Sequence, residues 1–412
     1  MRKNLTSFIF LLPLLFLAVG VIPSGAGVYV QCPILETGSL DPVTNTWISP
    51  DGQTVCIHLV ATDGMINMAD KTMTDPPNGR LQYIFGFTNV TGLPGWTTEA
   101  ILDTAMLGAE FSAPTISIKE GQNVYLTLTN RSFVIRPDLF DSHSVHFHGF
   151  PNAASIFDGE PMASTTPNPG SSFTYYYKAP VPGTYMYHCH VEASEHMQMG
   201  MLGSLYVRPL QDDAPPACPG GRVFAGFAYN DGDCSTGYDV VYPVQITAFD
   251  PDFHDADQNI QPLPFANMTD SYTLLNGRGY PDTINPAVLN NSFSGGPSQK
   301  INSIITATQG QRILLRISSL STIDFYTLMS PGIPMKVVAK DTRLLRTSFP
   351  PFTNLYYDTN SVTLGGGMSV DVIMDTATIT PGRYFLYTSN VTHLNNDQED
   401  FGGMMTEITI LP

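Results

Sequence analysis

Two short groups of histidines, one of them built around a cysteine, hold the residues best suited to do chemistry in this chain. Six of the nine histidines lie in these groups. The first group holds His143, His146 and His148, and the second holds His188, His190 and His196. Cys189 stands inside the second group, and Met201 follows it. Imidazole, thiolate and thioether groups are ligands of soft and borderline transition metals, so this pattern predicts a metal protein.

Alternation along an extended chain separates these ligands into two sets. Successive side chains of a strand point to opposite faces, so His146 and His148 would share one face. His188 and His190 would also share a face, and Cys189 between them would point the other way, into its own domain. The four histidines that face outward are therefore a candidate second metal site.

The inward-facing thiolate has three candidate partners. His143 lies an odd number of positions before His146 and can face the side of Cys189, and a loop can fold His196 and Met201 back over the thiolate. Two imidazoles and a thiolate with a weak axial thioether are the ligand set of blue, type 1 copper. Zinc sites more often combine several cysteines and histidines without a thioether.

Three other histidines have weaker patterns. His58 lies in a strand-like stretch, and we expect it to be a structural residue. His254 stands among acidic residues, and we expect a loop role for it. His393 is left open between a metal ligand and a loop residue.

Several methionines lie near the cysteine motif. Met197, Met199 and Met201 follow Cys189, and Met162 precedes it. Thioethers favour Cu(I), so a cuprous substrate could dock there. Methionine is also a common filler of irregular cores, which is the simpler interpretation.

The elements that position these residues are predicted to be β-strands. Strand-like runs with Gly, Pro, Asn or Asp between them recur at 115–119, 124–129, 173–178, 184–188, 204–207, 244–248, 312–317, 334–338, 369–374 and 384–388. No long segment has a convincing helical period. Short strands with frequent turns indicate an all-β sandwich or barrel protein.

Two pairs of similar segments suggest an internal duplication. Residues 116–128 resemble 305–317, and residues 182–187 resemble 381–387, in the same order. We predict domain 1 at 53–210, a linker at 211–221 rich in Pro and Asp, and domain 2 at 222–412. An N-terminal extension at 28–52 precedes domain 1.

The N-terminus predicts export. Basic residues, an apolar run and small residues make 1–27 a secretory signal peptide, so we expect a secreted or periplasmic protein. The five cysteines then have access to disulfide formation. Spacing does not fix their connectivity, but Cys32 with Cys56 and Cys218 with Cys234 are the simplest local pairs, which leaves Cys189 free. The formal net charge of −17 argues against nucleic acid as a partner.

The two histidine motifs resemble those of the multicopper oxidases, within the cupredoxin superfamily. The resemblance implies two Greek-key cupredoxin β-sandwiches, with type 1 copper on His143, Cys189, His196 and Met201. It also implies that His146 matches a type 2 copper ligand and that His148, His188 and His190 match type 3 ligands. The stretch 191–195 between Cys189 and His196 is longer than the family's usual spacing by two residues.

Domain 2 departs from the family pattern. A trinuclear copper cluster needs four histidines from each of two domains, and domain 2 has no His-x-His pair. The duplication places the counterpart of the first motif at residues 325–332, which contain no histidine. It places the counterpart of His-Cys-His at Thr388, Ser389 and Asn390. Domain 2 is therefore expected to lack its own copper motif.

Copper nitrite reductases are a second family pattern that the chain resembles. On that pattern His148 and His188 would bind copper with one histidine from a neighbouring subunit, for which His393 is the candidate. His146 would then occupy the place of a catalytic, proton-moving residue. Relatives with two domains assemble as trimers, so the resemblance also implies a homotrimer.

The expected activity is that of a copper oxidoreductase. Electrons would enter from a donor protein or a small reductant at type 1 copper. They would pass through Cys189 to a second copper site at which His146 and His148 act in catalysis on a small acceptor, oxygen first and nitrite second. The alternative from another class is an electron carrier or copper-binding protein without catalysis, which the missing histidines of domain 2 favour.

Overall fold

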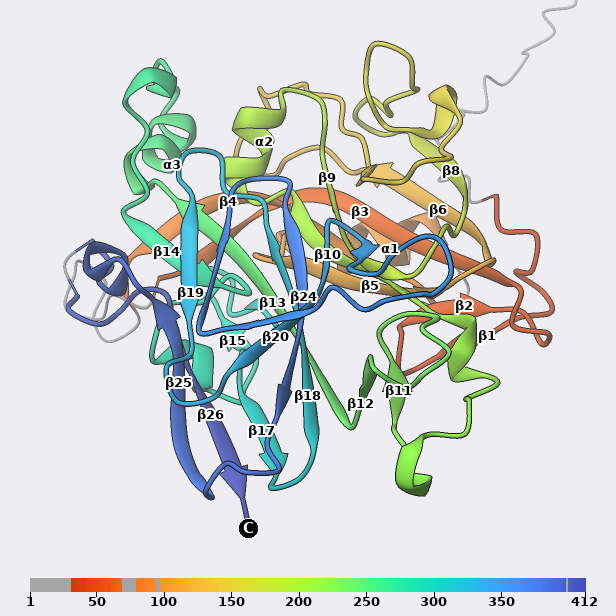
Figure 1. The fold of residues 1–412 in the computed structure, drawn as a ribbon. Coiled ribbons are helices and arrows are strands. Elements are labelled where there is room, and N and C mark those ends of the chain that lie inside the picture. Colours follow the sequence, from red (N-terminus) through yellow and green to blue (C-terminus); the bar gives the residue numbers. More distant parts are fainter. Residues whose placement is uncertain (1–30, 69–78, 94–96, 398) are drawn as a thin grey trace, which may run out of the picture.

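The chain folds into two β-sandwiches that pack side by side, as the computed structural model shows (Figure 1). The structure describes residues 31–68, 79–93, 97–397 and 399–412. The predicted signal peptide at 1–27 lies outside the described residues. No helix among the described residues is long and apolar enough to cross a membrane.

Domain 1 consists of a six-stranded sheet and a four-stranded sheet. The first contains β1 (Ser39–Asp41), β2 (Thr46–Ile48), β3 (Thr54–Asn67), β4 (Leu81–Asn89), β6 (Asn123–Asn130) and β8 (Ser172–Lys178). The second contains β5 (Ala113–Lys119), β7 (His146–His148), β9 (Gly183–His188) and β10 (Leu202–Arg208). The residues of the N-terminal extension thus supply two strands of the domain 1 sheet.

Domain 2 repeats this plan with a seven-stranded and a five-stranded sheet. The first contains β13 (Val240–Phe249), β14 (Tyr272–Leu275), β18 (Arg312–Ser319), β20 (Met335–Lys340), β21 (Arg343–Leu344), β22 (Tyr357–Thr359) and β24 (Ser369–Asp375). The second contains β17 (Ile305–Thr308), β19 (Tyr326–Met329), β23 (Ser361–Leu364), β25 (Gly382–Thr388) and β26 (Met405–Leu411). The all-β prediction is confirmed.

Short elements connect the sandwiches. Two small ribbons pair β11 (Gly226–Phe227) with β12 (Gly237–Tyr238) and β15 (Leu289–Asn290) with β16 (Pro297–Gln299). The α-helices of the described residues are α1 (Thr98–Thr104), α2 (Ala193–Met199) and α3 (Pro251–Gln258). Single 3-10 turns are η2 (Ser155–Phe157), η3 (Leu210–Asp212), η4 (Pro219–Gly221), η5 (Phe265–Asn267), η6 (Asp282–Ile284) and η7 (Val391–Leu394).

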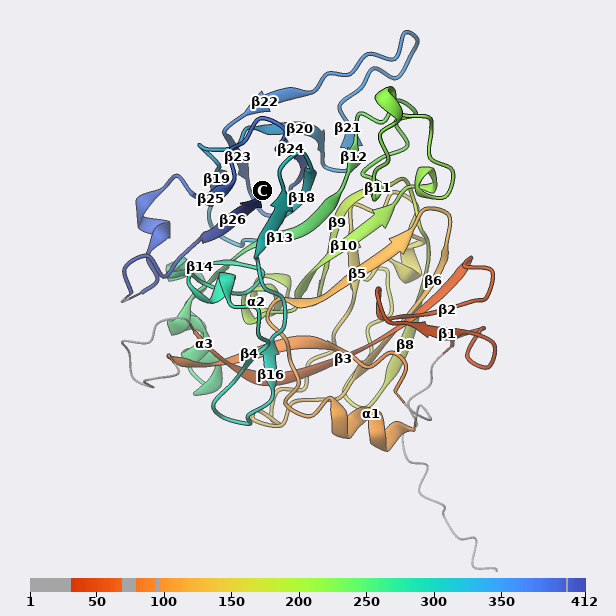
Figure 2. The same cartoon turned by 90° about the horizontal axis from the view of Figure 1, so that it is seen from below.

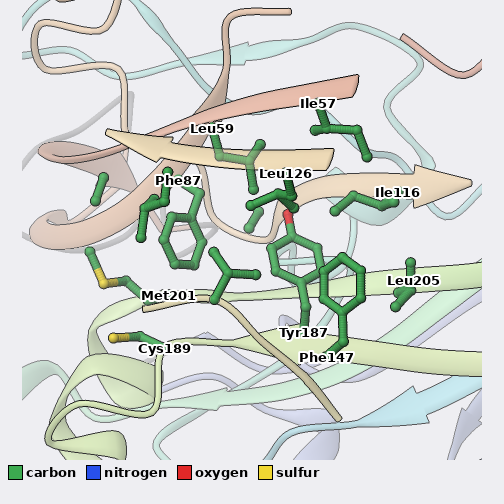
Figure 3. Packing of buried hydrophobic residues seen from close by; sticks show 14 of the residues in the cluster. Ile57, Leu59, Phe87, Ile116, Leu126, Phe147, Tyr187, Cys189, Met201 and Leu205 are labelled. Atoms are coloured by element: carbon green, nitrogen blue, oxygen red, sulfur yellow. The ribbon is translucent and has the colours of Figure 1, made fainter. Parts of the chain in front are cut away.

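The core of domain 1 lies between its two sheets and ends at the cysteine motif. Phe147 stacks on Tyr177 with ring centroids 4.1 Å apart, and both rings are buried. Figure 3 shows Cys189 and Met201 at one end of this apolar layer, with their sulfur atoms on the same side. The strand alternation inferred from sequence therefore places the thiol in the interior.

The domain interface sets β9 and β10 of domain 1 beside β13 and β18 of domain 2 (Figure 2). Its polar centre is the buried carboxylate of Asp371. That carboxylate accepts hydrogen bonds from Thr184 at 2.5 Å and from Tyr229 at 2.6 Å, and the Arg316 guanidinium lies 3.5 Å away. Thr184 is the domain 1 member of this network, so its buried hydrogen bond ties β9 to domain 2.

The disulfides are the two local pairs expected from the sequence. Cys32 is bonded to Cys56, and Cys218 is bonded to Cys234. Cys189 is the free cysteine and is fully buried. The first bond ties the chain before β1 to β3, and the second closes the segment around η4.

Candidate metal centres

The first candidate centre is the buried set of His143, Cys189 and His196. One ligand atom from each lies within 4.8 Å of the others. His196 Nδ1 is 3.2 Å from the Cys189 sulfur, and the His143 and His196 rings are 4.9 Å apart between centroids. His143 Nδ1 is buried and has no hydrogen-bond partner in the structure. A buried imidazole nitrogen without a partner beside a thiol fits a metal ligand, as the sequence predicted.

The Cys189 sulfur has backbone partners that hold it in place. The Ser144 N–H points at it from 3.4 Å, and the sulfur lies 3.6 Å from the Val191 carbonyl oxygen. Burial raises the pKa of Cys189 to about 11. The thiol therefore keeps its proton at neutral pH in the absence of metal, and a metal must displace that proton when it binds.

The two imidazoles are held neutral. Burial lowers the pKa of His196 to about 4, and burial followed by the nearby His196 lowers the pKa of His143 well below its ordinary range. A neutral imidazole offers a free lone pair at neutral pH. The histidines are thus ready to bind a cation without first losing a proton.

Helix α2 brings His196 and Met201 back to the cysteine. The segment expected to be a loop forms a helical turn from Ala193 to Met199, and Gly200 ends it at a φ of 123°. The Met201 N–H then donates to the His196 carbonyl at 2.8 Å, and the Cys189 N–H donates to the Met201 carbonyl at 3.0 Å. The helix accommodates the longer spacing and keeps all three residues together.

The second candidate centre is formed by His146, His148 and His188. One ring nitrogen from each lies within 4.8 Å of the others. His148 Nδ1 is 3.4 Å from His188 Nε2, and the β7–β9 register pairs His146 with His188. His190 stands next to this group, with its ring centroid 5.1 Å from that of His146. All four imidazoles come from domain 1 of one chain.

Backbone carbonyls orient two of these rings. The Asp158 carbonyl is 2.6 Å from His146 Nδ1, and the Cys189 carbonyl is 2.8 Å from His188 Nδ1. Each Nδ1 donates to its carbonyl, which leaves Nε2 as the lone-pair nitrogen. Burial lowers the pKa of His188 to about 3 and also lowers the pKa values of His146 and His148. No sequence pattern pointed to Asp158, because it lies in an irregular loop.

A pocket of about 350 Å³ opens over these histidines. Its domain 1 wall has the four imidazoles and the α2 residues Ala193, Ser194 and Met197. Its domain 2 wall has Leu320, Ser321, Thr322, Gly366 and Gly367. No histidine of domain 2 is among the described residues that line the pocket. The pocket can therefore hold a small molecule against the four imidazoles of domain 1.

His393 lies elsewhere in the described structure. It lines a different pocket in domain 2, where its Nε2 is 3.8 Å from Asp324 and its ring packs against Tyr326. A single chain does not bring His393 to the other imidazoles. Its role as a ligand supplied by a neighbouring subunit stays a prediction.

The other two histidines have structural roles. His58 is buried and shares a hydrogen bond with Thr129 at 2.8 Å, as expected. The loop expectation for His254 is wrong, because Asp250 caps α3 and Pro251 starts it, which places His254 in the helix. Its ring is fully buried between backbone carbonyls of two domain 1 segments.

The four methionines near the cysteine motif do not gather at one place. Met199 and Met201 are fully buried in the domain 1 core, whereas Met162 is 89% exposed. Met197 lines the histidine pocket. Two of the four thioethers therefore fill space in the core, and Met201 lies next to Cys189 at the first centre (Figure 3).

Comparison with known proteins decides the family. One family model described as multicopper oxidase matches residues 97–212, and a second with the same description matches 252–409. The chain belongs to the multicopper oxidase family. The donor sets of both centres fit copper, as the family description implies.

Curated relatives match part of this multicopper oxidase chain. Laccase 1 from Metarhizium acridum is 33% identical over 123 residues, which cover 29% of this chain and 18% of that protein. Laccase-1 from Agaricus bisporus is 26% identical over 228 residues, covering 55% of this chain and 37% of that protein. The chain thus spans well under half the length of these relatives.

Solved structures share the fold. Blue copper oxidase from Nitrosomonas europaea superimposes with a TM-score of 0.60 at 21% identity and covers 86% of this chain and 85% of its own. Copper nitrite reductase from Nitrosomonas europaea gives a TM-score of 0.54 at 17% identity and covers 87% and 94%. These likenesses confirm the cupredoxin-fold architecture.

Proposed function

We propose that this protein is an exported multicopper oxidase that passes single electrons from a donor to a small acceptor, most simply oxygen. The donor, a protein or a small reductant, delivers electrons at the centre of His143, Cys189, His196 and Met201. The acceptor binds in the pocket over His146, His148 and His188. Copper at the two centres would supply the one-electron redox chemistry.

The connection between the two centres carries this proposal. Cys189 belongs to the first centre and its neighbour His188 to the second, so the backbone joins them directly. The His188 ring also hydrogen-bonds the Cys189 carbonyl at 2.8 Å. This short covalent path, with a hydrogen bond alongside it, suits electron transfer between the centres.

The pocket residues have separate tasks. His146 and His148 hold the acceptor side, and the Asp158 carboxylate lies 3.6 Å from His146 Nδ1, where it can stabilise a protonated ring. Ser194, Ser321 and Thr322 offer hydroxyls at the pocket wall. Protons that a reduced acceptor requires can therefore be relayed by groups of this chain.

Nitrite is the second candidate acceptor. The observation that favours it is the grouping of three imidazoles with no domain 2 histidine lining the described pocket. Three nitrogens suit one copper ion, whereas a trinuclear cluster needs more ligands. Activity assays with oxygen and with nitrite distinguish the two acceptors. Light scattering measures whether the protein forms the homotrimer that the nitrite reductase pattern implies.

Copper counting with matched variants tests the proposal. The loaded wild-type protein is expected to bind at least two coppers per chain and to consume oxygen or nitrite with a reductant. His148→Ala should lose the second copper and turnover but keep the blue colour. Loss of the second copper in His393→Ala as well would indicate that a neighbouring subunit supplies a ligand. One copper with a blue signal alone, and no effect of His148→Ala, would identify an electron carrier instead.

A further inference from the structure

The type 1 ligand loop of domain 1 is closed by two backbone hydrogen bonds. The Cys189 N–H donates to the Met201 carbonyl at 3.0 Å, and the Met201 N–H donates to the His196 carbonyl at 2.8 Å. These bonds hold the cysteine, the histidine and the methionine in a fixed arrangement. The same pair of hydrogen bonds elsewhere in the chain would therefore identify the positions that correspond to these three residues.

Domain 2 contains the same two bonds. The Thr388 N–H donates to the Met404 carbonyl at 3.0 Å, and the Met404 N–H donates to the His393 carbonyl at 2.9 Å. Thr388 therefore takes the place of the cysteine, so the sequence alignment that placed Ser389 there was wrong by one residue. The different loop length after β25 hid this register, because His393 follows Thr388 by fewer positions than His196 follows Cys189.

The fourth position follows from the strand register. β7 pairs His146 with His188, and β19 pairs Met329 with Tyr387, the residue just before Thr388. Counting back along β19 places Tyr326 where domain 1 has His143. The ring centroids of Tyr326 and His393 are 4.9 Å apart, equal to the separation of the two histidine rings in domain 1.

Domain 2 thus keeps two of the four ligand types and replaces the other two. His393 and Met404 remain, and Met404 is fully buried. His393 Nδ1 is buried without a hydrogen-bond partner in the structure. In domain 1 the corresponding Nδ1 of His196 is the atom that faces the Cys189 sulfur. An unpartnered nitrogen with this placement fits a ligand position that lacks its metal.

A protein contact takes the place of the metal. The Tyr326 hydroxyl donates a hydrogen bond to Asp270, and Thr388 is fully buried at the cysteine position. A neutral hydroxyl at that position cannot supply the thiolate that binds soft copper. The rest of the cupredoxin framework around the position is intact.

We propose that domain 2 contains a degenerate blue copper centre, in which Thr388 prevents copper binding because it replaces the thiolate, and Tyr326 removes one of the two imidazoles. The centre would take copper on His393 and Met404 once a thiolate is supplied, and more tightly once an imidazole also replaces Tyr326. Binding would displace the thiol proton to water and leave the oxidation state of the added Cu(II) unchanged. This inference does not depend on which acceptor domain 1 uses.

The test removes the blue centre of domain 1 and restores that of domain 2. In a Cys189→Ser background, which lacks the thiolate of domain 1, Tyr326→His with Thr388→Cys is expected to restore an intense thiolate-to-Cu(II) absorption near that of the wild type. Adding His393→Ala should abolish it. The proposal would be overturned if the triple variant had native circular dichroism but stayed colourless and bound no more copper than Cys189→Ser alone.

A milder variant covers the case in which the double replacement does not fold. Cys189→Ser with Thr388→Cys alone keeps the Tyr326–Asp270 contact and adds one thiol. It is expected to bind about one further equivalent of Cu(II) with a thiolate charge-transfer band that His393→Ala removes. A folded variant whose new thiol binds no copper would contradict the inference.

Discussion

His254 of domain 2 hydrogen-bonds the backbone carbonyl of Gln198 in helix α2, with 3.0 Å between His254 Nε2 and the oxygen. Gln198 stands two residues after the proposed copper ligand His196. Its side-chain oxygen also accepts a hydrogen bond from Thr322 of domain 2 at 3.2 Å. Domain 2 therefore holds the ligand helix of domain 1 from outside.

The first prediction concerns this contact. His254→Phe keeps a ring on Phe249, whose centroid is 3.5 Å from that of His254, but removes both ring nitrogens, one of which donates a hydrogen bond from the neutral imidazole. The carbonyl that loses its donor costs about 1–3 kcal/mol of unfolding free energy. We expect lower stability and faster copper loss from the blue centre, measured by denaturant titration and chelator kinetics. Thr322→Val removes only the contact with the Gln198 side chain and should have the smaller effect on stability and copper loss. Equal effects of the two variants would show that His254 does not hold the backbone of helix α2.

A second prediction concerns the glycine that faces the three histidines. Gly367 has a φ of 83°, and a Cβ there would lie 3.0 Å from His148 Nε2. Gly367→Ala should therefore reduce occupancy of the second copper site and leave the blue absorption intact. Gly121 has a φ of 81° and open space around it, so Gly121→Ala carries only the backbone strain of about 1 kcal/mol. Equal copper content in the two variants would exclude a steric effect on His148.

A third prediction concerns the buried carboxylate at the domain interface. Asp371→Asn leaves the buried Arg316 charge without its counterion, and breaking such a pair costs about 3–5 kcal/mol. The exposed pair of Arg312 and Asp375 provides the control, because Asp375→Asn should cost less than about 1 kcal/mol. Urea unfolding curves measure both. Similar losses for the two variants would mean that Asp371 does not hold the interface.

A fourth prediction concerns acid stability through His58. Burial lowers the pKa of His58 to about 3 from an ordinary value of 6.5. The unfolded chain then binds a proton that the folded chain does not, so stability is fully present above pH 6.5 and falls as the pH drops from there toward 3. The loss is about 1.4 kcal/mol per pH unit. His58→Gln should flatten this slope between pH 6 and 4 in unfolding titrations; an unchanged slope would assign acid sensitivity to other groups.

A fifth prediction concerns the thioether of the blue centre. Met201→Leu keeps the buried volume but removes the weak axial thioether donor. The thioether stabilises Cu(II) more than the leucine side chain does, because leucine cannot donate electrons to the metal. The reduction potential of the blue copper should rise, and the protein should stay blue. Redox titration measures the potential. Met199→Leu is the control, because Met199 is equally buried but lies outside the ligand set, and its potential should match the wild type.

The sequence alone predicted the candidate ligands of the first centre and determined the fold class. Strand alternation requires Cys189 to point away from His188 and His190, and order along the chain selects His143, His196 and Met201 as its partners. These inferences needed only local geometry, which a strand imposes on any sequence. The local disulfide pairs were only the simplest of several open connectivities, and the structure decided between them.

The tertiary structure decided what no local pattern contains. It placed His254 in a helix, because capping by Asp250 and a distant carbonyl of β4 outweigh the loop-like composition. It set His393 in the degenerate centre of domain 2, since that register depends on hydrogen bonds between β25 and β26 and not on spacing from a motif. Contacts between residues far apart in the chain are chosen by packing of whole sheets, and this packing is a property of the folded molecule that adjacent residues do not encode.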